Sequence, residues 1–298
     1  MRFSKIIILF ALILSFGVSN AQQDANYNLY RYNMNFVNPS YSGAAKNAEI
    51  GFNLKSQWSG VEAAPETQSV FFGTSLGRNV GMGVTVINDK TFIESQVNLM
   101  ANFSYKVALT QETNLFFGVS AGANSYKVNT DGLFTFGISS DPSLTNLDNS
   151  FNPNIGAGVH LQGEKFFLSY SIPKLLTSDR LENTNGTARL NQERLHMYLA
   201  GGYDIRIGME TVLKPSVMTR YIDSSPLSID LTGAIEFSEK FEFGATYRFE
   251  EAVGGYMLVQ AARWVQIGYS YQSPTNSPVS KITNGSHEIF IKFDLLKP

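Results

Sequence analysis

Three histidines, His160, His196 and His287, are the residues of this chain best suited to acid–base chemistry. A serine hydrolase needs a histidine within hydrogen-bonding distance of a serine and of a third polar side chain that orients the ring. Ser169 and Asn154 could supply such groups, but no spacing in the sequence marks a nucleophile. All three histidines fall in alternating segments, at the parity that we assign to the polar face. We therefore interpret them as polar interior residues and predict that the protein is not an enzyme.

Carboxylates are the second set of candidate residues. Asp131, Asp141 and Asp148 occur in one stretch, but their spacing does not match a calcium-binding loop. We interpret them as solvated, and we predict no metal and no other cofactor. Other charged residues alternate with apolar ones, and their mixed signs favour interior ion pairs over an ion-selective path, which would need one dominant sign. These residues are Lys106, Arg220, Asp230, Glu236, Glu242, Arg248, Lys292 and Asp294.

The elements that must position these side chains are strands, and the clearest pattern spans residues 227–249. Apolar and polar residues alternate there in two runs that are separated only by residues 238–240. Successive side chains of a strand point to opposite faces, so each run has one apolar and one polar face. Each run is about ten residues long, which is the length that a tilted strand needs to cross a bilayer. The pattern predicts a transmembrane hairpin.

Twelve further segments follow the same rule, which gives about 14 strands, an even number as a single-chain bacterial barrel needs. No segment after the first 21 residues approaches the roughly 18 apolar residues of a membrane helix, so any later membrane span must be a strand. We predict an all-β, transmembrane antiparallel β-barrel over residues 48–298. The twelve segments are 48–58, 67–76, 81–88, 92–107, 114–127, 154–162, 165–172, 194–204, 211–221, 254–261, 264–272 and 286–295.

The predicted connections separate by length. Every second one is short, whereas the three long ones, 128–153, 173–193 and 273–285, all fall on the other side. Outer-membrane barrels have short periplasmic turns and longer outer loops. A secreted β-sandwich has no reason to segregate its loops in this way, so the pattern favours the barrel.

The N-terminal region differs from the rest. Residues 1–21 predict a secretory signal peptide that is cleaved near Ala21. Together with the barrel, it predicts that the mature chain is in the outer membrane. The chain has no cysteine, which excludes a lipid-modified cysteine and any disulfide. Loss of Arg2 and Lys5 with the signal takes the net charge from −2 to −4, so no basic surface for nucleic acid is expected. Residues 22–47 are rich in aromatics and asparagine and lack a clean period, and we expect a short periplasmic lead-in segment.

Two motifs near the start of the barrel resemble the opening signature of the PorP/SprF family, which belongs to the type IX secretion and gliding-motility apparatus of Bacteroidota. They are VNPSYSG at 37–43 and SQWSGVEAAPETQS at 56–69. The similarity continues at 152–160, 166–176, 196–205, 213–221 and 268–271. The chain departs from the family at Gln272, where an acidic residue is common, and from barrels in general at its C-terminus, where an aromatic residue is common. The signature or partner-contact candidates are Asn38, Pro39, Gly43, Gln57, Trp58 and Pro65.

The resemblance implies a function that composition and periodicity do not. It implies a non-enzymatic outer-membrane protein that assists the export, surface attachment or motor coupling of a specific type IX cargo, such as a large adhesin. The implied partners are type IX secretion components, that cargo and outer-membrane lipid. A channel for small solutes is the alternative. The width of the lumen and the presence of a constriction distinguish the two.

Overall fold

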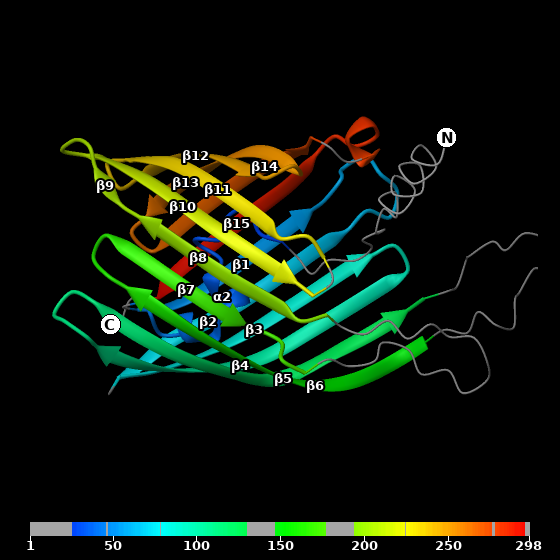
Figure 1. The fold of residues 1–298 in the computed structure, drawn as a ribbon, viewed down its shortest axis with the longest axis horizontal. Coiled ribbons are helices and arrows are strands. Elements are labelled where there is room, and N and C mark those ends of the chain that lie inside the picture. The colour runs from blue at the N-terminus through cyan, green and yellow to red at the C-terminus, as the bar shows by residue number, and fades with distance from the viewer. Residues whose placement is uncertain are drawn as a thin grey trace, which may run out of the picture.

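A computed structural model of the chain describes residues 26–45, 47–77, 79–129, 147–176, 194–223, 225–275 and 278–295 (Figure 1). Fourteen antiparallel strands form a closed barrel, which confirms the predicted fold class. Each strand pairs with its neighbours in sequence, and the ring closes where the last strand pairs with the first. The strands are β1 (Ala48–Ser56), β2 (Glu66–Gly77), β3 (Val80–Thr91), β4 (Glu94–Ala108), β5 (Asn114–Val128), β6 (Leu147–Gln162), β7 (Phe166–Ile172), β8 (His196–Tyr203) with β9 (Ile205–Arg206), β10 (Thr211–Ile222), β11 (Ser228–Phe237), β12 (Phe241–Arg248), β13 (Ala252–Ala262), β14 (Val265–Pro274) and β15 (Ser286–Leu295).

β8 and β9 are two parts of one barrel strand. Residues 216–222 of β10 pair with β8, and residues 212–213 of β10 pair with β9. Pro215 lies between these two paired stretches. Proline has no N–H group to donate to a neighbouring strand, so the ladder is interrupted there. Asp204, opposite this gap, donates its N–H to Lys165 O at 2.6 Å. Its side chain bonds to a residue inside the barrel, Arg31.

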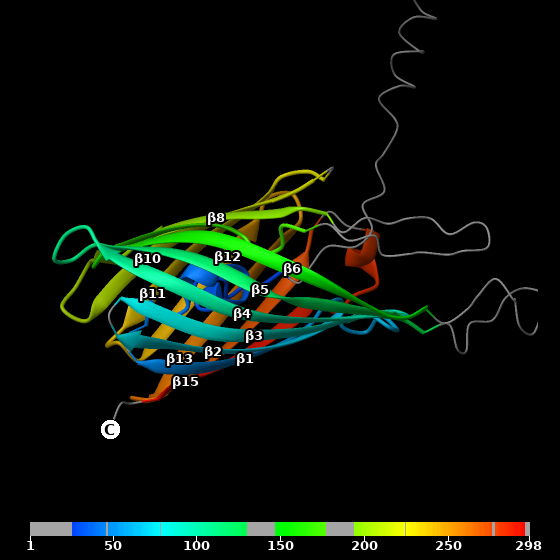
Figure 2. The same cartoon turned by 90° about the horizontal axis from the view of Figure 1, so that it is seen from below.

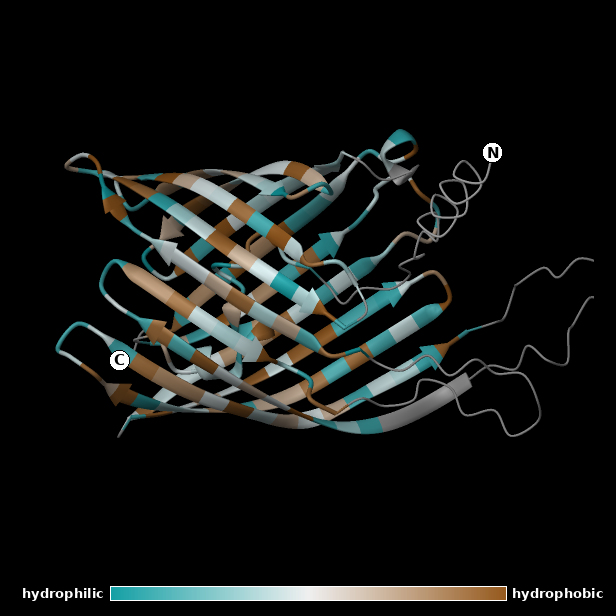
Figure 3. Cartoon of the chain, in the orientation of Figure 1, coloured by the Kyte–Doolittle hydropathy of each residue, from teal (hydrophilic) through white to brown (hydrophobic). Residues whose placement is uncertain are grey.

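Hydrophobic and hydrophilic residues alternate along the strands (Figure 3). This alternation gives the barrel wall an inner and an outer face of different polarity. In β11, Asp230 and Thr232 are buried inside the barrel, whereas Leu231 and Phe237 point outward with 48% and 43% of their surface exposed. An apolar outer face with aromatic residues near both strand ends is typical of barrels in a bilayer. Within the described residues, no helix is both long and apolar enough to cross a membrane. The outward aromatic residues include Tyr105, Phe117, Tyr203, Phe237, Phe241 and Trp264 at one end and Tyr221, Tyr247, Phe249, Tyr269 and Tyr271 at the other.

The two ends of the barrel differ as the sequence indicated. One end, at the left of Figure 1, carries the short turns, and we call it the short-turn end. At one of these turns, Ser238 and Glu239 both have positive φ angles, 53° and 56°, as the two central residues of a type I′ turn require, and Lys240 N donates to Phe237 O at 3.0 Å. The opposite end, which we call the loop end, carries the long connections. Most residues of two of these connections, 130–146 and 177–193, lie outside the described part of the chain.

Candidate functional site: a plug inside the barrel

Residues 26–45 lie inside the barrel, where the blue segment is enclosed by the strands in both views (Figures 1 and 2). We call this segment the plug. It contains a short helix, α2 (Met34–Val37), and a 3-10 turn, η1 (Pro39–Tyr41). We expected a lead-in segment in the periplasm. The structure instead places residues 26–45 in the lumen. Their aromatic and amide side chains contact the buried polar side chains of the strands there.

Aromatic packing fixes the centre of the plug. Tyr27 stacks on Phe36 with ring centroids 5.1 Å apart, and Phe36 meets the ring of Phe71 from β2 edge-on at 5.2 Å. Leu29 and Met34 are each only 1% exposed. Burial of side chains of this size stabilises by about 1.5–3 kcal/mol each. The lumen therefore contains an apolar core, although its wall is mainly polar.

A buried glutamate of β15, Glu288, binds the plug. It is fully buried and accepts hydrogen bonds from two groups of the plug, Asn28 N at 2.7 Å and Asn33 Nδ2 at 3.1 Å. It also accepts one from Asn53 Nδ2 of β1 at 2.8 Å. Hydrogen bonds to a charged acceptor are stronger than those between neutral groups. Glu288 is not among the interior charges predicted from the sequence. Its place on the polar parity of β15 is the signal that could have indicated it.

Charged contacts hold the plug at the short-turn end. Arg31 bonds to Asp204 at 2.5 Å and lies over the ring of Phe167 at 5.3 Å. Tyr32 donates to Glu242 Oε2 at 2.5 Å, and Lys214 lies 2.9 Å from the same oxygen. Phe167 is on β7, and Glu288, which also binds the plug, is on β15, half-way around the ring of strands, so the plug spans the lumen.

Other predicted interior charges also form pairs. Arg248 bonds to Asp230 at 2.6 Å, and Lys214 to Glu236 at 2.5 Å. Lys292 lies 3.5 Å from Asp294. Side chains of opposite charge along the wall thus form ion pairs, as predicted from the sequence.

Tyrosine hydroxyls add further contacts between plug and wall. Tyr27 shares a hydrogen bond with Ser69 at 2.7 Å, and Tyr30 donates to Ser216 at 2.9 Å. Burial raises the pKa of both phenols above the ordinary value, because the charged form would lose its water. Both side chains therefore stay neutral at physiological pH.

The signature residues Asn38, Pro39 and Gly43 belong to the plug. Asn38 is 1% exposed and donates through Nδ2 to Ser169 Oγ at 2.6 Å and to Val159 O at 3.2 Å. Its Oδ1 accepts from the backbone N–H of Ser40 at 3.0 Å, which caps η1. Pro39 is the first residue of η1, where the missing N–H costs nothing. This part of the motif therefore joins the plug to β6 and β7.

Glycines in the wall give the plug room. A Cβ added to Gly118 would lie 2.1 Å from Ser40 N, and one added to Gly158 would lie 2.0 Å from Asn38 Oδ1. Gly43 has a φ of +82°, and its Cβ would meet Gly81 Cα at 2.5 Å. Only glycine allows the two backbones to approach so closely. At Gly118 and Gly158, the absence of a side chain thus lets the plug dock against the wall.

The other signature residues, Gln57, Trp58 and Pro65, lie in the β1–β2 loop at the loop end. Gln57 N donates to Pro65 O at 2.9 Å, which closes the loop at its base. Trp58 has a φ of 49°, is half-buried, and donates its N–H to Ser286 Oγ at 3.3 Å. This loop is thereby joined to the start of β15. The six candidates thus form two separate groups.

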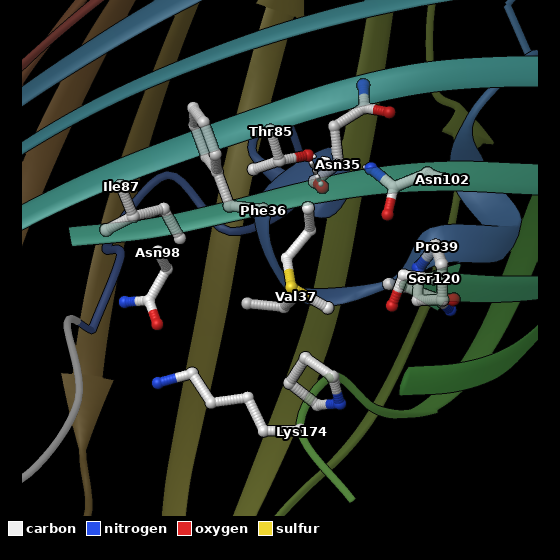
Figure 4. A pocket seen from close by; sticks show the side chains of 13 residues that line it. Asn35, Phe36, Val37, Pro39, Thr85, Ile87, Asn98, Asn102, Ser120 and Lys174 are labelled. Carbon is white, nitrogen blue, oxygen red and sulfur yellow. Dashed lines mark hydrogen bonds between the residues drawn. The ribbon is translucent and has the colours of Figure 1, made fainter. Parts of the chain in front are cut away.

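A small cavity of about 40 Å³ lies between the plug and β3–β5 (Figure 4). Val37 and Pro39 line it from the plug, and Asn98 and Asn102 line it from the wall. Lys174, which follows β7, lines a further side. A space of this volume holds a few ordered waters rather than a metabolite.

The histidines do not form a catalytic group. His160 is 1% exposed and is surrounded by the rings of Tyr41, Phe116 and Phe167. His196 is buried inside the barrel as predicted, but our prediction for His287 was wrong. Glu288 and its even-numbered neighbours face the lumen, so His287 faces outward and bonds to the Tyr269 hydroxyl at 2.7 Å. Among the described residues, no group of three or more His, Cys, Asp or Glu side chains is placed to hold a metal ion.

Comparisons with solved structures find an outer membrane protein and a porin at low sequence identity. Omp33 of Acinetobacter baumannii matches with a TM-score of 0.48 and 8% identity, over 84% of this chain and 98% of that chain. KdgM porin matches with a TM-score of 0.39 and 6% identity, over 83% and 99% of the two chains. A search of curated proteins found no match.

A family model gives the identification. The model of the type IX secretion system membrane protein PorP/SprF matches residues 19–293. This match includes the plug, both signature motifs and nearly all of the barrel. The chain therefore belongs to the PorP/SprF family of type IX secretion system membrane proteins.

Proposed function

We propose that this protein is a non-enzymatic docking or accessory component of type IX secretion, and that it serves a specific cargo such as a large adhesin. The observation that supports this proposal best is the plug. It contacts opposite walls of the lumen and is held by buried hydrogen bonds, ion pairs and aromatic packing. A lumen occupied in this way disfavours the alternative, a channel for small solutes. A barrel whose lumen is filled by the plug can still present binding surfaces at both of its ends.

The two ends would face different partners. We place the short-turn end in the periplasm, since short turns are periplasmic in outer-membrane barrels. The short-turn end would then contact components of the secretion system. Outer-membrane lipid would surround the apolar outer face. The β1–β2 loop with Trp58 is an ordered surface at the loop end, where a cargo on the cell surface could bind. The signal peptide at residues 1–21, with cleavage near Ala21, lies outside the described residues and remains part of this proposal.

Comparison of the surface proteomes of a deletion strain and its parent tests the proposal. We expect one or a few type IX cargo proteins to disappear from the surface, while other type IX cargo is still exported. An unchanged cargo profile together with slower uptake of a small solute would contradict the docking function and support the channel.

The two tryptophans of the chain give a matched pair of variants for the same strain. Trp58→Ala alters the loop end, whereas Trp264→Ala removes an exposed ring that stacks on Phe293 at the short-turn end. We expect Trp58→Ala to reduce cargo display at an unchanged amount of folded barrel, and Trp264→Ala to leave display unchanged. Equal effects of the two would argue against a cargo surface at the β1–β2 loop.

A further inference from the structure

The turn between β9 and β10 carries exposed apolar side chains at the short-turn end. Ile205, Ile207 and Met209 have 41%, 58% and 98% of their surface exposed. Three other turns at this end, β4–β5, β6–β7 and β11–β12, have only polar residues or glycine at their tips, at 110–112, 163–165 and 238–240. Contiguous exposed apolar groups mark an interaction surface. The β9–β10 hairpin, residues 205–213, therefore differs from these turns.

The apolar residues of this hairpin belong to the outer face of the barrel. Lys214 of β10 forms ion pairs inside the barrel, so Leu213 beside it faces outward. Ile205 is the cross-strand partner of Leu213 and therefore shares its face. Ile207 follows at the same parity as Ile205. Asp204 has the other parity, and its side chain reaches inward to the plug.

The hairpin is continuous with the aromatic residues of the outer face. Ile207 N donates to Thr211 O at 3.0 Å, and Thr211 is the cross-strand partner of Phe237. Phe237 pairs in turn with Phe241, and both rings are exposed. Aromatic residues in such a row lie at the interface between the bilayer and water. Ile207 therefore extends this row, and Met209 lies beyond it at the tip of the turn.

Hydrogen bonds hold the tip of the hairpin in place. Gly208 N donates to Thr211 O at 3.2 Å, which closes the turn. Ser238 of the β11–β12 turn donates its N–H to Glu210 O at 2.7 Å and its hydroxyl to Glu210 Oε2 at 2.5 Å. The exposed Met209 is thus displayed by an ordered turn that is joined to its neighbour.

We propose that the β9–β10 hairpin is a lipid anchor, in which Ile207 and Met209 insert among the headgroups and upper acyl chains of the leaflet at the short-turn end. Apolar side chains bind to this region in proportion to the area that they bury. The outward face of Ile205 and Ile207 and their continuity with the aromatic row favour lipid over a protein beneath the barrel. Asp204, which bonds to Arg31 of the plug, immediately precedes the hairpin. The anchor therefore lies beside a contact that holds the plug.

The fluorescence of a bimane label on Met209→Cys tests the anchor, since the native chain has no cysteine. Gln111→Cys is the matched control, because Gln111 is an exposed polar residue at the tip of the β4–β5 turn. Each purified mature variant is labelled and reconstituted into vesicles of phosphatidylethanolamine and phosphatidylglycerol, with and without a lipid that carries a nitroxide near the top of its acyl chain. We expect the nitroxide to quench the label of Met209→Cys strongly and that of Gln111→Cys weakly. The emission of the Met209→Cys label should also lie at shorter wavelength.

A further variant separates insertion of the hairpin from insertion of the label, which is itself apolar. Ile207→Asn in the Met209→Cys protein removes one apolar side chain of the anchor, so quenching should fall. The gel migration of unheated samples shows that each variant has formed a barrel. Equal quenching of Met209→Cys and Gln111→Cys, or quenching that Ile207→Asn does not change, overturns the anchor. The measurement involves no cargo and no secretion component, so its result is independent of the proposed docking function.

Discussion

At the scale of the residue, Asn38 joins two parts of the protein that are more than a hundred positions apart in sequence. Its amide donates to Ser169 and accepts from the N–H of Ser40, and all three groups are buried. Asn38→Ala leaves these partners without their hydrogen bonds, so we expect the free energy of unfolding to fall by about 1–3 kcal/mol. The temperature at which the purified barrel loses its heat-resistant gel migration measures the change. Ser169→Ala should have a smaller effect, and an Asn38→Ala barrel as stable as the parent would contradict this role.

Gly118 offers a second test of how the plug is seated. In Gly118→Val, the added Cβ would overlap Ser40 N, and overpacking of this kind costs about 1–3 kcal/mol. We expect the plug to become accessible to protease, which mass spectrometry of cleaved products detects. Gly233→Val is the control on the outer face, because no atom lies within 4 Å of its added Cβ. Equal cleavage of the two variants would count against the predicted clash.

The contacts and orientation of some single residues could be predicted from the sequence, and those of others could not. The motif around Asn38 and Pro39 was recognised, but its contacts were not, because they lie on strands far along the chain. His287 was placed on the wrong face because its own polarity breaks the alternation of β15. Ile289, Ile291 and Phe293 share its parity and belong to the outer face, whereas the buried Glu288 has the other parity. Residue roles that depend on long-range contacts therefore needed the structure.

At the scale of the element, the strands were predicted closely and the plug was not. Most strand boundaries agree to within two residues, since each strand carries its own period of two. β6 begins several residues earlier than expected, within a connection that we had assigned as a long loop. The plug has no period, and its position depends on contacts with partners up to 260 residues away, such as Glu288. Composition alone could therefore show only that residues 22–47 differ from the barrel.

The plug also gives a prediction about conductance. In planar bilayers, the intact protein should show little ion current, because residues 26–45 fill the lumen. A variant that lacks these residues should show a larger and steadier current through the emptied lumen. Gly118→Val, which displaces only part of the plug, should give an intermediate or fluctuating current if the deletion does not fold. Equal currents from the intact and deleted proteins would mean that the plug does not close the barrel.

At the scale of the whole molecule, the outer face must match the depth of the bilayer. Leu231 and Phe237 are on the outer face of β11 with similar exposure, but Leu231 is near the middle of the strand and Phe237 at its end. Leu231→Arg should destabilise the barrel by about 2–4 kcal/mol and Phe237→Arg by about 0–1 kcal/mol. Unfolding by denaturant in lipid vesicles measures both. Equal losses would mean that the two positions are not at different depths.

The orientation of the whole barrel can be tested with two cysteine variants, since the native chain has no cysteine. Glu62 lies in the β1–β2 loop at the loop end and Glu239 in the β11–β12 turn at the short-turn end, and both are exposed. In outer-membrane barrels, the long loops face the outside of the cell and the short turns face the periplasm. On whole cells, an impermeant maleimide should therefore label Glu62→Cys and leave Glu239→Cys unlabelled, and permeabilised cells should label both. Labelling of Glu239→Cys alone on whole cells would show that the barrel has the opposite orientation.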